Sequence, residues 1–103
     1  MKLESKVAVV TGAGSGIGRG IALALAARGA RVAAVDIDEA TARETAEVIR
    51  AAGGRALAVQ GDTSRAADVD RAVSTAVREL GALEVMVNNA GVLDGYFNVD
   101  ETD

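Results

Sequence analysis

The sequence predicts one α/β domain with a parallel sheet. Four short apolar runs alternate with three longer stretches of helix-forming residues. The runs are almost continuously apolar, which is typical of parallel strands that are buried on both faces. Half of the 103 residues are hydrophobic but only one Tyr and one Phe are present. The core must therefore consist of small aliphatic side chains, which suits helices packed closely on a sheet.

The alternating pattern sets the order of the elements. Strands are expected at residues 7–10, 31–36, 56–60 and 84–88, and helices at about 16–28, 38–52 and 64–80. Asp38 and Ser64 stand where the second and third helices begin, and both are residue types that cap helix N-termini. Right-handed crossovers then give a parallel sheet with helices on both faces.

Composition and charge exclude several classes of function. The net charge of −4 argues against a nucleic-acid partner, which requires a basic surface. The chain has no Cys and no His, so thiolate metal sites, disulfides and a histidine base are absent, and we predict no metal site. No apolar run reaches the length of a membrane span, and the first six residues lack the apolar core of a signal peptide. We expect a cytoplasmic chain with no membrane partner.

A glycine-rich turn follows the first apolar run. Residues 11–18 read Thr-Gly-Ala-Gly-Ser-Gly-Ile-Gly and lead into a helical stretch. Backbone N–H groups and the positive end of the helix meet there, as in phosphate sites. Gly12 allows a sharp turn, Gly16 lets a diphosphate approach the backbone, and Gly18 lets the helix pack closely on the strand. The spacing differs from G-x-G-x-x-G and from the P-loop, and a purely structural loop is the less favoured alternative.

Asp36 ends the second predicted strand. A carboxylate there can accept hydrogen bonds from both hydroxyls of an adenosine ribose, and it repels a 2′-phosphate. Neither Ser15 nor Ile37 brings a positive charge that would hold such a phosphate. The sequence therefore favours NAD over NADP. The alternative is a turn or capping role, but Asp38 is better placed to cap the helix and leaves Asp36 for a ligand.

Polar residues also follow the third and fourth strands. Asp62 can accept a hydrogen bond from an adenine amino group, or it can begin the next helix, and the sequence favours neither. Residues 88–91 read Asn-Asn-Ala-Gly. Two amides that leave a buried strand need partners in neighbouring strands or in a ligand, and the small pair behind them leaves room for a cofactor.

These features, in this order and at these distances, resemble the short-chain dehydrogenase/reductase family. The resemblance covers essentially the whole chain and implies a Rossmann-type three-layer sheet with strand order 3-2-1-4. It also implies that Asn88 ties the central strands together. The segments that carry it are residues 11–18, Asp36, residues 62–63 and residues 88–91.

The resemblance assigns parts of the cofactor to residues. Ser15, Ile17 and the turn backbone would hold the diphosphate, and Asp36 would hold the adenosine ribose. Residues 62–63 would flank the adenine, and residues 89–90 would lie against the central sugars. The cofactor-binding residues expected in full are Gly12, Ser15, Gly16, Ile17, Gly18, Asp36, Asp62, Thr63, Asn89, Ala90 and Gly91.

The catalytic segment of the family is not matched. Family members use a Tyr-x-x-x-Lys pair, in which the lysine lowers the pKa of the tyrosine. Here the only tyrosine is Tyr96, Asp100 stands four residues later, and the only lysines are Lys2 and Lys6. No catalytic residue is therefore assigned, and we expect the chain alone to be inactive. It is interpreted as the NAD(H)-binding part of an oxidoreductase that acts on an alcohol or carbonyl; the alternative is a non-catalytic dinucleotide-binding or regulatory module.

The same resemblance implies a truncated fold. Residues 1–93 are expected to form a Rossmann half-domain, and residues 94–103 an acidic tail or the start of a further element. A fifth strand would pair with the outer edge of residues 84–88 in the family. Without it, that edge is apolar and open, which favours self-association.

Overall fold

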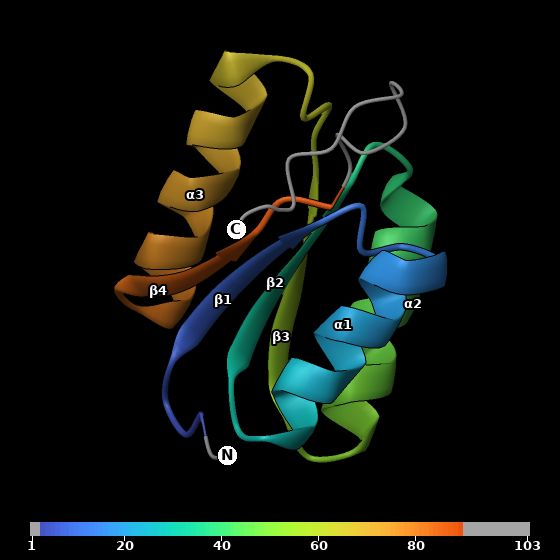
Figure 1. Ribbon diagram of the computed structural model, residues 1–103, viewed down its shortest axis with the longest axis vertical. Helices are drawn as coiled ribbons and strands as arrows, with labels where there is room; N and C mark the ends of the chain where they lie inside the picture. Colours follow the sequence, from blue (N-terminus) through green and yellow to red (C-terminus); the bar gives the residue numbers. More distant parts are fainter. Residues whose placement is uncertain (1–2, 90–103) are drawn as a thin grey trace.

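The computed structural model describes residues 3–89, which form a single four-stranded sheet with three helices (Figure 1). In chain order the elements are β1 (Val7–Thr11), α1 (Gly16–Ala27), β2 (Arg31–Asp36), α2 (Glu39–Ala51), β3 (Arg55–Gln60), α3 (Ala66–Leu80) and β4 (Leu83–Val87). Every expected strand and helix is present, and no boundary differs from its prediction by more than two residues.

The strand order is β3-β2-β1-β4 and all pairs are parallel, as predicted. Val9 of β1 lies opposite Ala33 of β2 and opposite Met86 of β4. All four strands therefore end at the same edge of the sheet, which is where ligands bind in open α/β sheets. The pairing of β1 with β4 contains one register shift, between Val7 and Ala8.

Helices α1 and α2 cover one face of the sheet, and α3 alone crosses the other (Figure 1). Side chains alternate along each strand, so Val10 packs into the core under α1 and α2, whereas Val9 packs under α3. The buried residues are almost all Ala and Val, as the lack of aromatics predicts. Small side chains bring the helix backbones close to the strand ends.

Strand β4 is less buried than the sequence suggests. Its residues alternate between partly buried and exposed, and Met86 is 42 % exposed. The expectation that residues 84–88 form a strand covered on both faces is therefore wrong for this strand. On the α3 side only one helix covers the sheet, and Val77 of that helix is itself 43 % exposed. Among residues 3–89, no second strand pairs with β4.

Candidate functional site

The candidate site lies at the edge where the four strands end. The glycine turn follows β1, Asp36 is the last residue of β2, residues 62–63 follow β3, and Asn89 follows β4. The sheet therefore brings together all predicted cofactor-binding residues between Gly12 and Asn89 at this edge. The remaining two, Ala90 and Gly91, lie outside the described residues.

The glycine turn presents its backbone to open space at Gly16. Gly12 and Gly16 adopt left-handed backbone conformations, with φ of 63° and 58°. A Cβ placed on Gly16 would meet no atom within 4 Å. Ser15 precedes α1 in an extended conformation, and its side chain makes no capping hydrogen bond. Because the first amides of a helix have no partner within it, this end of α1 can receive an anion.

Gly18 lets the start of α1 lie against the turn. A Cβ on Gly18 would overlap the carbonyl of Gly12 and would come within 2.8 Å of Nδ2 of Asn89. The close packing at Gly18 joins α1 to the turn and to the segment after β4, rather than to the strand itself as predicted. Ile17, in contrast, points outward and is 75 % exposed.

Asp36 is already bonded to the backbone on both carboxylate oxygens. Its Oδ2 accepts the N–H of Gly14 at 2.9 Å, and its Oδ1 accepts the N–H of Asp38 at 3.0 Å. The expectation that capping by Asp38 leaves Asp36 wholly to a ligand is wrong, although Asp38 does cap α2 through the N–H groups of residues 40 and 41. Each carboxylate oxygen can accept more than one hydrogen bond, so the partly exposed Asp36 retains capacity for ribose hydroxyls.

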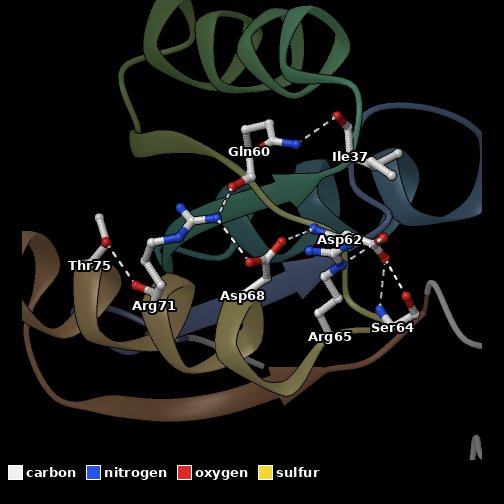
Figure 2. Close-up of polar contacts among 8 residues, drawn as sticks. All are labelled: Ile37, Gln60, Asp62, Ser64, Arg65, Asp68, Arg71 and Thr75. Carbon is white, nitrogen blue, oxygen red and sulfur yellow. Dashed lines mark hydrogen bonds and ion pairs between the residues drawn. The ribbon is translucent and has the colours of Figure 1, made fainter.

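The loop after β3 is organised by contacts within itself and with the start of α3 (Figure 2). The N–H of Asp62 donates to Oδ2 of Asp68 at 2.8 Å. The N–H and the hydroxyl of Ser64 donate to Oδ1 of Asp62 at 3.0 and 2.6 Å. Helix α3 begins after Arg65, without a side-chain cap. The prediction that Ser64 caps this helix is wrong, because Arg65 occupies the N-cap position and Ser64 lies one residue before it.

These bonds determine the ionisation of Asp62. The hydrogen bonds from the Ser64 side chain and then from its backbone N–H lower the pKa of Asp62, and the charge of Arg65 acts in the same direction. Desolvation opposes them but is outweighed. Asp62 is therefore an ionised acceptor at neutral pH, which suits a donor such as an adenine amino group. The alternative that Asp62 begins the next helix is wrong, because α3 begins after Arg65 and Asp62 shapes the turn before it. Its contact with the adenine stays a prediction.

Thr11 links the segment after β4 to β1. Its hydroxyl accepts the N–H of Asn89 at 2.8 Å and lies 3.1 Å from Oδ1 of Asn88, to which it can donate. Asn88 thus joins the end of β4 to β1, and because β4 is an edge strand of the described sheet, a role in tying central strands together stays a prediction. Thr11 is 2 % exposed, and sequence reasoning gave it no role of its own. The signal that could have found it is a polar residue at the end of a buried valine run.

Thr45 of α2 is a second residue that the sequence analysis missed. It is fully buried, and its hydroxyl donates to the carbonyl of Ala13 in the glycine turn at 2.8 Å. The sequence does carry a signal for Thr45, namely a polar residue within an apolar helix face. That face is formed at helical spacing by Ala42, Ala46 and Ile49.

A separate groove of about 860 Å³ lies at the opposite edge of the sheet. Its lining includes Leu23, Arg28, Ile49 and Arg55. The helices α1 and α2 end there, and the negative end of a helix disfavours phosphate. This groove is therefore a poorer dinucleotide site than the strand ends. Residues 3–89 contain no group of acidic side chains that could hold a metal ion, and no helix within them could cross a membrane.

Comparison with known proteins identifies the family. A family model described as short chain dehydrogenase matches residues 6–103. This chain belongs to the short-chain dehydrogenase family. The match covers all four strand ends that form the candidate site.

Relatives of very different lengths match the chain. An uncharacterised oxidoreductase of Thermotoga maritima is 43% identical over 102 residues, which is 99% of this chain and 39% of that protein. A short-chain dehydrogenase/reductase homologue of Bacillus subtilis is 41% identical over 93 residues, which is 89% of this chain and 85% of that protein. The chain thus spans about two fifths of the Thermotoga relative but most of the Bacillus one.

Solved structures of the family superpose on the chain. A 7α-hydroxysteroid dehydrogenase in complex with NADH and 7-oxo glycochenodeoxycholic acid matches with a TM-score of 0.83 and 35% identity, over 85% of this chain and 34% of that one. A family member from Burkholderia phymatum in complex with NAD matches with a TM-score of 0.79 and 35% identity, over 84% of this chain and 31% of that one.

Proposed function

We propose that the chain binds NAD(H) across the carboxyl edge of its sheet. One observation carries the proposal: the carboxylate of Asp36 is bonded to the N–H of Gly14, at 2.9 Å, inside the turn that opens α1. A sugar-binding group and a diphosphate-binding turn are thus in contact with each other. The relatives that were solved with NAD or NADH share this fold, which supports the same assignment.

Each part of the cofactor has its own partners in this proposal. The turn amides and Ser15 bind the diphosphate, because Gly16 leaves the space in front of the backbone open. Asp36 accepts the ribose hydroxyls, and Asp62 and Thr63 flank the adenine. The residues proposed to hold the cofactor are Gly12, Ser15, Gly16, Ile17, Gly18, Asp36, Asp62, Thr63, Asn89, Ala90 and Gly91.

We further propose that NAD is preferred over NADP. A 2′-phosphate would lie against the carboxylate of Asp36, and like charges at that distance repel. The neighbouring exposed residues Ser15 and Ile37 carry no charge that would offset the repulsion.

The whole protein is proposed to be an oxidoreductase that exchanges hydride with an alcohol or carbonyl. The bound nicotinamide would supply the hydride chemistry, and the residues of this chain bind and orient it. The proton transfer requires a Tyr-x-x-x-Lys pair, and the sequence places neither residue type suitably: Tyr96 is followed four residues later by Asp100. The chain alone is therefore expected to bind the cofactor without turnover.

A second candidate is a non-catalytic dinucleotide-binding or regulatory module. The Bacillus subtilis relative favours it, because this chain covers 85% of that protein. Such a module would have to cover the outer edge of β4, and we propose self-association through this edge as one way. Sedimentation at increasing concentration tests this proposal: a monomer throughout contradicts it. A cytoplasmic location stays a prediction.

Calorimetric titration of the chain with NADH and with NADPH tests the proposed function. NADH is expected to bind at least about tenfold more tightly, which corresponds to about 1.4 kcal/mol. Gly16→Ala should abolish the binding, because its methyl group enters the space in front of the turn. Gly53→Ala is the matched control: Gly53 is also left-handed, with φ of 93° and open space around it, but it lies at the opposite edge. No binding of NADH by the folded chain would refute the proposal.

A further inference from the structure

The peptide unit between Ala13 and Gly14 is held at both of its polar ends. Its carbonyl accepts the hydroxyl of Thr45 at 2.8 Å, and its N–H donates to Oδ2 of Asp36 at 2.9 Å. The C=O and N–H of a trans peptide point in opposite directions. A donor on one side and an acceptor on the other therefore fix the rotation of this peptide plane. The N–H before it, on Ala13, is also held, by the carbonyl of Val35 at 3.0 Å.

Thr45 is placed for this contact rather than for its own helix. Its hydroxyl lies 2.8 Å from the carbonyl of Ala13 and 3.2 Å from the carbonyl of Thr41, one turn earlier in α2. A hydroxyl has a single proton to donate, and the shorter distance favours Ala13. Both Ala13 and Thr45 are fully buried, so without this hydroxyl the carbonyl would lose its partner in a place that water does not reach easily.

Helix α2 also limits the turn sterically. A Cβ on Gly14 would overlap Oγ1 of Thr41 and would come within 2.9 Å of Oδ2 of Asp36. Thr41 and Thr45 stand four residues apart, on the same face of α2. The turn is therefore pressed between this helix face and the end of β2, and its shape depends on an element that follows it by more than twenty residues.

The peptide plane at residues 13–14 leads directly into the amides of Ser15, Gly16 and Ile17. A rotation of this plane would redirect those amides, because successive peptide units share a Cα. We propose that Thr45 is a positioning residue for dinucleotide binding, whose hydroxyl holds the Ala13–Gly14 peptide so that the following amides face the diphosphate. This inference rests on the proposed function and assigns a role to α2 within it.

A series at position 45 tests the inference in the full chain, with NADH as the probe. Thr45→Ser keeps the hydroxyl, Thr45→Val replaces it with a methyl group, and Thr45→Cys supplies only a weak donor. Thr75→Val is the control, because Thr75 of α3 donates to the carbonyl of Arg71 one turn earlier at 2.8 Å (Figure 2) and α3 lies on the other face of the sheet from α2 (Figure 1). Circular dichroism establishes that each variant is folded at the temperature of the titration.

We expect Thr45→Val to weaken NADH binding by about tenfold or more, the effect of losing one buried hydrogen bond. Thr45→Ser should restore the affinity to within about threefold, and Thr75→Val should leave it unchanged. If Thr45→Val does not fold, the comparison of Ser with Cys decides, and Cys should bind more weakly. Equal affinities of folded Ser, Cys and Val variants would overturn the inference while the proposed function stands. Absence of binding by the unmodified chain would overturn both.

Discussion

The two loops on either side of Asp36 in the sheet are held in different ways. The turn after β1 is fixed from outside, by Asp36 of β2 and by Thr45 of α2. The loop after β3 is fixed by bonds from Ser64 to Asp62 within the loop and by the bond from Asp62 to Asp68 at the start of α3 (Figure 2). The first loop can keep its shape only if the sheet and α2 are assembled. The second needs little more than the start of α3.

This difference matters for binding. The glycine turn carries few side chains, so the direction of its amides depends on neighbours that hold the backbone. The loop after β3 supplies side chains, whose direction is set locally. We therefore expect substitutions around the turn to change affinity strongly, and substitutions in the loop to act weakly.

Among substitutions of the residues that hold the two loops in place, the largest effect on NADH affinity is expected from Gly14→Ala. The added methyl group would overlap Thr41 and crowd Asp36, so the turn must move away from α2. We expect a loss of roughly 1–3 kcal/mol in unfolding free energy and a drop in NADH affinity of roughly a hundredfold. Chemical denaturation and calorimetric titration measure the two quantities.

Gly20→Ala is the control for this substitution. Gly20 lies in α1, where an added Cβ would meet nothing within 4 Å. It should stabilise the chain by about 0.5–1 kcal/mol and leave binding unchanged. Wild-type affinity in the Gly14 variant would mean that contact with α2 does not determine the shape of the turn.

An intermediate effect is expected from Asp36→Ala. The substitution removes the acceptors of two backbone N–H groups as well as the proposed ribose partner. We expect a loss of about 1.5–3 kcal/mol in stability, and NADH binding weakened by more than about tenfold. Asp36→Asn retains an acceptor and should recover part of the stability but not the affinity.

Asp38→Ala is the control that separates a loss of stability from a loss of NADH affinity. It removes the cap of α2, which costs about 1 kcal/mol, without touching the glycine turn. The prediction for Asp36 has its own contrary outcome. If the Asp36→Ala variant kept the unfolding free energy of the wild type and only bound NADPH more tightly, the bond between Asp36 and Gly14 would have no role in holding the turn.

The smallest effect on NADH affinity is expected from Ser64→Ala, in the loop after β3. Hydrogen bonds from Ser64 lower the pKa of Asp62 below its ordinary value of 3.8. Because the folded-state pKa is the lower one, the associated stability is present above about pH 4 and is lost as the pH falls through the folded pKa. Ser64→Ala should raise the pKa of Asp62, which a carboxyl NMR titration measures. An unchanged titration curve would contradict the assigned cause.

Sequence reasoning identified the elements and the strand ends that form the site, because both depend on local patterns, whereas the strand order was implied by the resemblance to a known family. Apolar runs located β1 to β4, and the glycine spacing located the turn. It could not find the bond between Asp36 and Gly14, which are separated by 22 residues, or the bond between Thr45 and Ala13, which are separated by 32. These contacts depend on how α2 packs on the sheet. The misassigned cap at Ser64 has a different cause: α3 begins at Ala66, two residues after the predicted start, so Ser64 lies in the turn before the helix and donates its hydroxyl proton to Asp62.

The central claim is that a dinucleotide lies across the strand ends and is held by the glycine turn. A ¹⁵N–¹H NMR titration of the chain with NAD tests it most directly. We predict that the amide signals of residues 14–18, Asp36 and Asn89 shift together on binding, while those of Gly29 and Gly53 at the opposite edge stay in place. Saturable shifts at Gly29 and Gly53, with the turn signals unmoved, would contradict it.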